Sequence, residues 1–391
     1  MERDIIIMGA GPAGLTAAIH ACRAGKRVLV LDKAGRAGTK LLLAGGGKGN
    51  VTNRHVETTD YIGGETDFAG YALSRVTPEA VLRQLEEAGI PLEEREHGRI
   101  FCTTSARAVL NLLLAQLPPE RCRIAPENPV TGITATGGVF AVTCENTTYR
   151  APRLVAATGS PAWPQCGADD SGLRLIRALG HRIVPPRPVL APLVMPPQWP
   201  LAGLAGISLP VRIRCDTPQS PLFEDALLFT HKGISGPAAL QASCWWSKGS
   251  AVHIDFLPGE DAEKLLDRGT GKATPQSVLA RRLPERLTAA LLPAETATRR
   301  VAELSRKQRT AIADAVHRHS VIPLRTEGLT KAEAAAGGVD TREVDPFTMH
   351  SRLVPGLFFC GEILDVTGRL GGYNLHWAWA SGTVAGESAA R

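Results

Sequence analysis

Residues 4–14 read Asp-Ile-Ile-Ile-Met-Gly-Ala-Gly-Pro-Ala-Gly, an apolar run that breaks into a glycine-rich turn. A helical pattern follows and ends near Gly25, and a second apolar run over residues 27–31 finishes on Asp32. The order of strand, glycine turn, helix, strand and acidic residue is typical of a βαβ unit that binds a dinucleotide. We therefore predict a Rossmann-type unit over the first 32 residues.

Each glycine of this pattern has its own expected task. Gly9 makes the tight turn, Gly11 lets the backbone approach a pyrophosphate, and Gly14 lets the helix pack closely on the strand. The N–H groups at the start of the helix attract the anion. Asp32 is placed to accept a hydrogen bond from the ribose 2′-OH.

The composition is that of a globular chain with more than one hydrophobic core, since 44% of its 391 residues are hydrophobic and 21% are charged. Glycines interrupt the N-terminal apolar run, which argues against a signal peptide. Apolar runs stay below the roughly 18 residues of a membrane span, so we expect a cytoplasmic protein that does not contact a membrane. The eight cysteines are scattered without CxxC or metal-ligand spacing, and we predict no metal site.

The net charge of +6 is concentrated in one segment, because residues 275–325 carry ten Lys or Arg against four Asp or Glu. Two interpretations stay open. The basic residues form either a face that docks nucleic acid or an Arg-rich helix surface in contact with solvent.

The pattern changes along the chain in a way that predicts a discontinuous first domain. Proline-rich segments begin at Pro185, β-like runs follow at 209–215 and 226–230, and residues 257–318 are mostly helical. We expect residues 321–326 to form a strand that returns toward the first domain. The predicted division is 1–186 with 336–391, an inserted β domain of 187–256 with 319–335, and a helical domain of 257–318.

The C-terminal segment favours FAD over NAD as the dinucleotide. A buried strand ends in Gly361-Glu362, and Gly371-Gly372-Tyr373-Asn374 opens a helix over 373–389. The Glu362 carboxylate can accept a hydrogen bond from a cofactor hydroxyl. The free N–H groups at the helix N-terminus can donate to the N1 and O2 edge of a flavin. Thr158-Gly159, after the apolar strand 153–157, is a further point where backbone approaches the cofactor. No second GxGxxG follows a strand, so NAD(P)H is expected to visit the flavin transiently.

These motifs resemble the BaiN/RdsA-type (YhiN-like) NAD(P)/FAD-dependent oxidoreductase flavoproteins over essentially the whole chain. The matching stretches are the N-terminal fingerprint and residues 40–53, 229–237, 336–339 and 361–382. The resemblance implies an α/β fold: a Rossmann-type FAD-binding domain from both chain ends, an inserted β-barrel-like domain and a small helical domain. It also implies reduction of carbon–carbon double bonds. One member is linked to bile-acid dehydroxylation, and another makes dihydrouridine in large-subunit ribosomal RNA.

This chain departs from the family pattern after its triple glycine, where Lys48-Gly49-Asn50 stands in place of Arg-Cys-Asn. If the family cysteine donates a proton to the substrate carbon, this chain needs another donor. Cys102, Cys166 and Tyr373 are the candidate replacements. The alternative is that the cysteine has no catalytic part.

The candidate catalytic residues are Lys48, Asn50 and Tyr373. Lys48 and Asn50, with Asn53, lie on a Gly-rich segment that we expect to contact flavin or substrate, and loop capping is the equal alternative. His231, which with Lys232 precedes an expected helix start, could be an acid, a substrate ligand or a turn-stabilising residue, and the structural role is favoured. At least one of Trp377 and Trp379 should be core. The predicted cofactor-binding residues are Gly9, Gly11, Pro12, Ala13, Gly14, Asp32, Lys33, Lys40, Val130, Thr158, Gly159, Gly361, Glu362, Gly372, Tyr373 and Asn374.

Three functions are compatible with these residues. The first is an NAD(P)H-driven reductase that transfers hydride from FAD to an activated C=C bond of a small molecule. The second is a ribosomal RNA dihydrouridine synthase that reduces uridine C5–C6 and docks RNA on residues 275–325. The third is a flavin-binding protein without turnover. The oligomeric state stays open.

Overall fold

The computed structural model describes residues 3–65, 67–145, 147–269 and 271–391. The chain splits into two compact units. The terminal unit contains both chain ends, residues 1–187 and 334–391, and the inserted unit contains residues 188–333. Each unit is described by itself below.

The terminal unit is built on a five-stranded parallel sheet in the order β21-β11-β1-β2-β7. Every residue of β1 and β2 is buried, as expected for parallel strands with both faces covered. The strands are β1 (Ile5–Met8), β2 (Val28–Leu31), β7 (Cys122–Ala125), β11 (Arg153–Ala156) and β21 (Leu357–Phe359).

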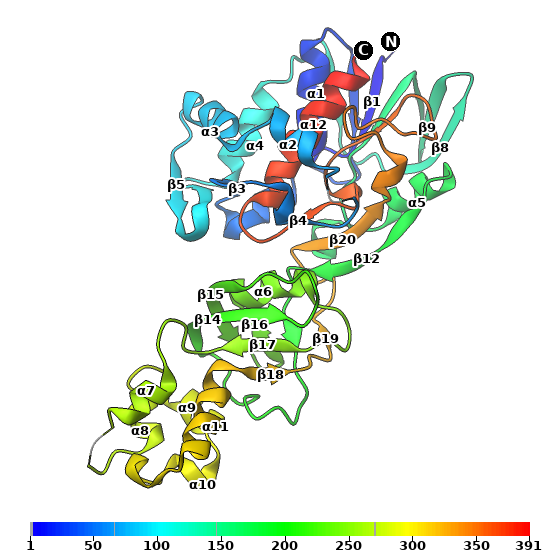
Figure 1. Cartoon of the computed structure of the whole chain (residues 1–391). Helices are drawn as coiled ribbons and strands as arrows, with labels where there is room; N and C mark the ends of the chain where they lie inside the picture. Colours follow the sequence, from blue (N-terminus) through cyan, green and yellow to red (C-terminus); the bar gives the residue numbers. More distant parts are fainter. Residues whose placement is uncertain (1–2, 66, 146, 270) are drawn as a thin grey trace. The chain divides into compact units, whose positions relative to one another are not determined.

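Two helices from opposite ends of the chain lie side by side on this sheet, α1 (Pro12–Arg23) in blue and α12 (Tyr373–Ala389) in red (Figure 1). Glycines of α12 allow the close approach. A Cβ at Gly382 would lie 2.6 Å from the Ala13 carbonyl oxygen, and one at Gly386 would lie 2.4 Å from the Ala17 carbonyl oxygen. The contact therefore requires glycine at both positions.

The rest of the terminal unit surrounds these elements. Residues 41–53 are not a plain loop, because a 3₁₀ helix (Leu41–Gly47) leads into a strand that pairs in the order β3-β6-β5. The remaining elements are β3 (Asn50–Asn53), β4 (Tyr61–Ile62), α2 (Gly70–Arg75), α3 (Pro78–Glu87), β5 (Leu92–Arg95), β6 (Arg99–Cys102), α4 (Ala106–Ala115), β8 (Val130–Thr136), β9 (Val139–Cys144), β10 (Thr148–Ala151), α5 (Ser171–Ala178), β12 (Ile183–Val189), β20 (Ala334–Val339) and β22 (Thr367–Gly368).

The inserted unit combines a seven-stranded sheet, in the order β18-β17-β14-β15-β16-β13-β19, with six helices among the described residues. Its strands are β13 (Leu193–Val194), β14 (Ser208–Cys215), β15 (Phe223–Phe229), β16 (Gly233–Ser235), β17 (Val252–Asp255), β18 (His319–Val321) and β19 (Arg325–Thr326). Its helices are α6 (Gly236–Trp245), α7 (Ala262–Asp267), α8 (Pro275–Leu279), α9 (Glu285–Leu291), α10 (Ala294–Ala297) and α11 (Arg306–His317).

The helices of residues 257–318 share one hydrophobic core with the strands of the inserted unit: Leu279, Leu287 and Ile312 are in the same buried cluster as Val211 and Ile254. The division into a separate β domain and helical domain stays a prediction. Among the described residues, the pairings leave β18 and β19 at the two ends of the sheet, so the barrel-like closure also stays a prediction.

The strand expected over residues 321–326 is corrected by the structure. Two short strands stand there, β18 paired with β17 and β19 paired with β13. Both belong to the sheet of the inserted unit, so two strands stand where one was expected. The sequence does not separate them because strand partners far away in the sequence leave no local signal in the apolar pattern.

We expect Gly386→Ala to destabilise the terminal unit by about 1–3 kcal/mol, because the new methyl group would overlap the Ala17 carbonyl. Thermal and denaturant unfolding would measure the change. The matched control is Gly132→Ala in β8, where the nearest atom to a new Cβ is 3.8 Å away. Equal stability of Gly386→Ala and the parent would contradict the packing argument.

Candidate functional site

The glycine turn between β1 and α1 is shaped by close backbone contacts. Gly9 has a φ of +107°, and a Cβ there would lie 2.3 Å from the Ala157 carbonyl oxygen. A Cβ at Gly14 would lie 2.0 Å from the carbonyl oxygen of Gly9. Gly9 therefore allows the turn to pass beside β11, and Gly14 allows α1 to start directly against the turn.

Gly11 differs from its two neighbours, because a Cβ there would meet no described atom within 4 Å. Gly11 is the N-cap of α1, and no side chain caps this helix start. The open space lies where free N–H groups and the positive end of the helix dipole favour an anion. This cradle fits the pyrophosphate of a dinucleotide.

The carboxylate of Asp32 lies beside the same turn. Its Oδ2 accepts a hydrogen bond from the Ala10 N–H at 2.5 Å, and its Oδ1 accepts one from the Ala34 N–H at 2.8 Å. Asp32 therefore fixes the glycine turn to the end of β2. Each carboxylate oxygen keeps a further acceptor position, which suits a ribose hydroxyl.

Thr158 follows β11, and its hydroxyl is buried without a hydrogen-bond partner among the described residues. The α5 helix packs on this side chain, since a Cβ at Gly172 would lie 2.0 Å from the Thr158 Oγ1 atom. A buried hydroxyl without a partner costs about 1–3 kcal/mol. A polar group of a bound cofactor would satisfy it, which is a second sign that the site is built for a ligand.

Glu362 stands just after β21 and joins three segments of the chain. Its Oε2 accepts from Lys40 Nζ at 2.6 Å and from Ser160 Oγ at 2.8 Å. Gly361, with a φ of +77°, lies so close to α1 that a Cβ would be 2.7 Å from that of Ala13. The ends of β1, β11 and β21 thus meet at one edge of the sheet, where open α/β folds bind their ligands.

The start of α12 packs against β3. Gly372 has a φ of +95°, and a Cβ there would lie 2.2 Å from the Thr52 carbonyl oxygen. The Asn50 amide, oriented by its hydrogen bonds, accepts from the Gly372 N–H at 3.0 Å and donates to the carbonyls of Ile100 and Thr52. The Asn50 side chain thus hydrogen-bonds backbone groups, whereas the sequence suggests a catalytic role for it.

Asn53 and Asn374 also bind backbone groups. The Asn53 amide donates to the carbonyls of His97 and Gly371, each at 3.0 Å. The Asn374 amide accepts from the Gly368 N–H and donates to the Gly368 carbonyl, both at 2.8 Å. Both asparagines hold the turn that begins α12, which agrees with the loop-capping alternative for Asn53, and contact of Asn374 with the cofactor stays a prediction.

Tyr373 is the candidate catalytic residue with the most defined surroundings. Its hydroxyl accepts a hydrogen bond from Arg369 Nη2 at 3.0 Å, and Arg369 is paired with Asp60 at 2.7 Å. Burial raises the pKa of Tyr373, so the phenol stays protonated at neutral pH. Because the hydroxyl accepts from Arg369, its own proton remains available to a further acceptor.

Other predicted residues lie in varied surroundings. Lys33 pairs with Asp169 at 2.7 Å, Val130 is half-buried at the start of β8, and Lys48 is exposed. His231 is exposed as well. Both tryptophans belong to the core, because Trp377 Nε1 donates to the Gly361 carbonyl and Trp379 Nε1 donates to the Val51 carbonyl.

The position of the missing family cysteine has an unusual backbone. Gly49 has a φ of +73°, a conformation that favours glycine. Of the candidate replacements, Cys102 is fully buried and its thiol donates to the Ser105 carbonyl at 3.3 Å, whereas Cys166 is half-buried. The thiol of Cys102 is therefore a poor proton donor for a ligand.

Sequence reasoning missed Ser160, Arg369 and Asp60, which support Glu362 and Tyr373. Of these three, only Arg369 could have been found from the sequence, because it is four residues before Tyr373 and so is a local candidate for contact with its side chain. Among the described residues, no group of three His, Cys, Asp or Glu could hold a metal ion, and no helix is long and apolar enough to cross a membrane.

Comparison with known families gives one match over nearly the whole chain, to the HI0933-like protein Rossmann domain at residues 3–388. The chain belongs to this family. This chain is similar over its full length to named reductases, and the protein is an FAD-dependent oxidoreductase. The family assignment therefore favours an enzyme over a flavin-binding protein without turnover.

Three relatives align over almost their whole length. The chain is 36% identical to the ribosomal RNA dihydrouridine synthase of Escherichia coli, covering 97% of this chain and 96% of that protein. It is 35% identical to the enzyme of that name from Haemophilus influenzae, covering 99% and 98%. It is 31% identical to the 3-dehydro-bile acid delta(4,6)-reductase of Clostridium scindens, covering 98% of each.

Solved structures show the same fold at low sequence identity. The quinol fumarate reductase subunit FrdA of Escherichia coli matches with a TM-score of 0.51 and 21% identity, covering 100% of this chain and 70% of that one. A flavocytochrome c3 fumarate reductase in its open conformation matches with a TM-score of 0.53 and 14% identity, covering 100% and 78%. The family's Rossmann fold is thus an α/β fold of the fumarate reductase flavoprotein type.

We expect Gly11→Ala to weaken FAD binding at least tenfold, about 1.4 kcal/mol, while the stability of the FAD-free protein stays unchanged. The reason is that the new methyl group meets no protein atom but enters the predicted pyrophosphate space. FAD titration and thermal unfolding measure the two effects. Gly14→Ala is the contrasting variant, since it overlaps the Gly9 carbonyl and should lower stability itself. Unaltered FAD affinity in Gly11→Ala would place the pyrophosphate elsewhere.

Proposed function

We propose that this protein reduces the C5–C6 double bond of a uridine in ribosomal RNA, with NAD(P)H as the electron donor. The observation that carries the proposal is its 36% identity, over 97% of the chain, to a ribosomal RNA dihydrouridine synthase. The sequence alone favours a small-molecule substrate. The relatives favour the RNA substrate, because both dihydrouridine synthases are more similar to this chain than the bile-acid reductase is.

The reaction adds one hydride and one proton across the double bond. When bound, FAD supplies the hydride to C6, and NAD(P)H restores the two electrons. The protein must hold the uracil ring flat against the flavin and donate a proton to C5. The charge that develops on the uracil O4 during hydride addition needs a hydrogen-bond donor or a cation nearby.

We assign the proton donation to Tyr373. Its hydroxyl accepts from Arg369 and so keeps a proton to give, and the ion pair of Arg369 with Asp60 holds that arrangement. Tyr373 is the first residue of α12, directly after the Gly371-Gly372 turn that we propose as the flavin contact. The cation beside the phenol stabilises the phenolate that remains after the proton has left.

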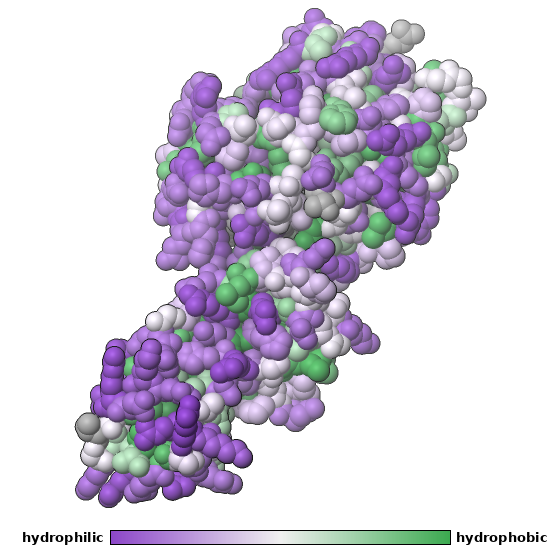
Figure 2. All heavy atoms as spheres, in the orientation of Figure 1, coloured by the Kyte–Doolittle hydropathy of each residue, from purple (hydrophilic) through white to green (hydrophobic). Residues whose placement is uncertain are grey.

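The basic segment of the inserted unit supports docking of RNA. Several of its arginines are paired with carboxylates, among them Arg282 with Glu260 and Arg318 with Asp314. Arg306 and Lys307, in the first turn of α11, are exposed and have no carboxylate partner in the described part of the chain. Figure 2 shows mainly hydrophilic residues on the visible face of these helices. Cations without partners are the groups that bind phosphates.

A second candidate is reduction of an activated C=C bond in a small molecule. The observation that favours it is Gly49, because this chain lacks the cysteine of the family pattern. The bile-acid reductase, at 31% identity, shows that the family includes an enzyme named for a small-molecule substrate.

The two candidates differ in their effect on ribosomal RNA. We expect deletion of the gene to remove dihydrouridine from one position of the RNA, as measured by nucleoside mass spectrometry of purified ribosomal RNA. Reintroduction of the parent gene restores the modification, and the Gly11→Ala gene restores less. An identical dihydrouridine profile with and without the gene would refute the RNA substrate and leave the small-molecule reductase.

We expect Tyr373→Phe to reduce dihydrouridine formation about 100-fold or more, the usual contribution of a general acid. NAD(P)H should reduce the bound flavin at the parent rate, because the change removes only the hydroxyl. Tyr61→Phe is the matched control, since the Tyr61 hydroxyl donates to the Tyr373 carbonyl at 3.0 Å and has no assigned part in proton transfer. Parent activity in Tyr373→Phe, or an equal loss in the control, would contradict the assignment.

For RNA docking, the expected result concerns salt dependence. The double variant Arg306→Gln with Lys307→Gln should weaken RNA binding and lower the slope of log K against log salt by about 1.4–1.8. Filter binding at several salt concentrations measures this slope. Arg318→Gln, which removes an arginine paired with Asp314 at 2.9 Å, should change it less. Equal slopes for the double variant and the parent would show that α11 does not contact phosphates.

A further inference from the structure

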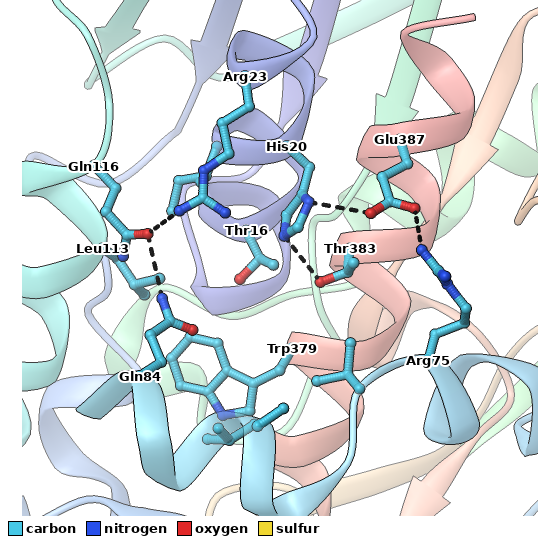
Figure 3. A pocket seen from close by; sticks show the side chains of 14 residues that line it. Thr16, His20, Arg23, Arg75, Gln84, Leu113, Gln116, Trp379, Thr383 and Glu387 are labelled. Atoms are coloured by element: carbon cyan, nitrogen blue, oxygen red, sulfur yellow. Dashed lines mark hydrogen bonds and ion pairs between the residues drawn. The ribbon is translucent and has the colours of Figure 1, made fainter. Parts of the chain in front are cut away.

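The terminal unit contains a cavity of about 260 Å³ on the side of α1 that faces α12, between these helices and the segments that carry α2, α3 and α4 (Figure 3). None of the residues predicted for FAD lines it. His20, on its wall, is nine residues beyond Gly11 in the sequence, or about 13 Å along the helix axis. The cavity is therefore separate from the glycine turn.

The size of the cavity limits what it can hold. Pockets for drug-sized ligands and cofactors measure roughly 300–1,000 Å³. A volume of about 260 Å³ suits a small metabolite and is too small for FAD or NAD(P)H.

The floor of the cavity is apolar. Ile19, Val81, Leu113 and Trp379 line it, and each is less than 9% exposed. Figure 3 shows the Trp379 indole ring at the base of the space. The indole N–H already donates a hydrogen bond to the Val51 carbonyl oxygen at 3.0 Å. The ring therefore offers its apolar surface to a ligand. An apolar ring or a short aliphatic chain is the group that this floor accepts.

The rim of the cavity carries a net positive charge. Arg75 pairs with Glu387 at 2.9 Å, and Glu387 also lies 3.5 Å from His20. Burial lowers the pKa of His20, so this ring is neutral at pH 7. Arg23 donates to the neutral amide of Gln116 at 2.7 Å and has no carboxylate partner among the described residues. Arg23 is thus a cation at the rim that lacks a counter-ion.

We propose that this cavity binds a small organic anion, with an apolar body on Trp379 and a carboxylate or phosphate group on Arg23. Guanidinium groups bind both anions through two parallel hydrogen bonds. The combination of an apolar floor and one unneutralised cation at the rim is typical of sites that take amphipathic metabolites. The proposal does not depend on the substrate of the reductase.

Benzoate and phenyl phosphate are suitable probes, because each joins one ring to one anionic group. We expect each to bind the FAD-loaded full chain saturably, with a Kd in the millimolar range or tighter, as measured by ligand-observed NMR. Loading with FAD keeps the probes out of the cofactor site. Benzamide, of the same shape without the charge, should bind at least fivefold more weakly than benzoate.

Variants locate the binding. Arg23→Gln should weaken benzoate binding at least fivefold, and Gln84→Trp, a change at an exposed position of the rim, should block it. Arg83→Gln is the matched control, because Arg83 is exposed on the same helix as Gln84 and does not line the cavity. Absence of saturable binding by both anions would overturn the proposal. Binding that persists in Arg23→Gln and Gln84→Trp, or equal binding of benzamide, would overturn it as well.

Discussion

The packing of α12 on α1 is the contact on which the rest of the terminal unit depends. Gly382 and Gly386 bring the backbones of the two helices so close that a Cβ at either position would meet a carbonyl oxygen of α1. This contact fixes the C-terminal helix α12 against the N-terminal helix α1. It brings Gly361 beside Ala13 and so assembles the ligand edge of the sheet from both chain ends.

The candidate site consists mostly of backbone and of side chains that hold the backbone. Asp32, Asn50, Asn53 and Asn374 bind N–H or carbonyl groups of the turns around the proposed cofactor position. Such a site fixes the cofactor and leaves few side chains to select the substrate. Relatives named for ribosomal RNA and for a bile acid are similar to this chain over its full length, as expected when one fold hosts more than one function. In our account, the surface of the inserted unit binds the substrate RNA. Tyr373 donates the proton.

The sequence predicts most of the terminal unit because its signals are local. The apolar runs of β1 and β2, the glycines between them and the helix over 373–389 are all visible within short windows, and the helix bounds agree with α12. The βαβ unit follows from the first of these segments, and the family resemblance also uses residues 40–53, 229–237, 336–339 and 361–382. The match over residues 3–388 confirms the family.

The remaining features depend on partners far away in the sequence. Residues 50–53 become a strand because β6 pairs with them, and residues 319–326 belong to the inserted sheet because β17 and β13 lie beside them. The amide partners of Asn50 come from residues 100 and 372. The cavity lined by Arg23 and Trp379 likewise needs five separated helices, so neither pattern nor spacing indicates it.

The most direct test of the account is an experimental structure of the FAD-loaded protein. The account predicts the pyrophosphate over the Gly11 N–H at the start of α1, with the Thr158 hydroxyl and Glu362 in contact with the cofactor. It further predicts the flavin ring edge at the Gly372-Tyr373 start of α12. A pyrophosphate away from Gly11, or a flavin ring that does not reach α12, would contradict it.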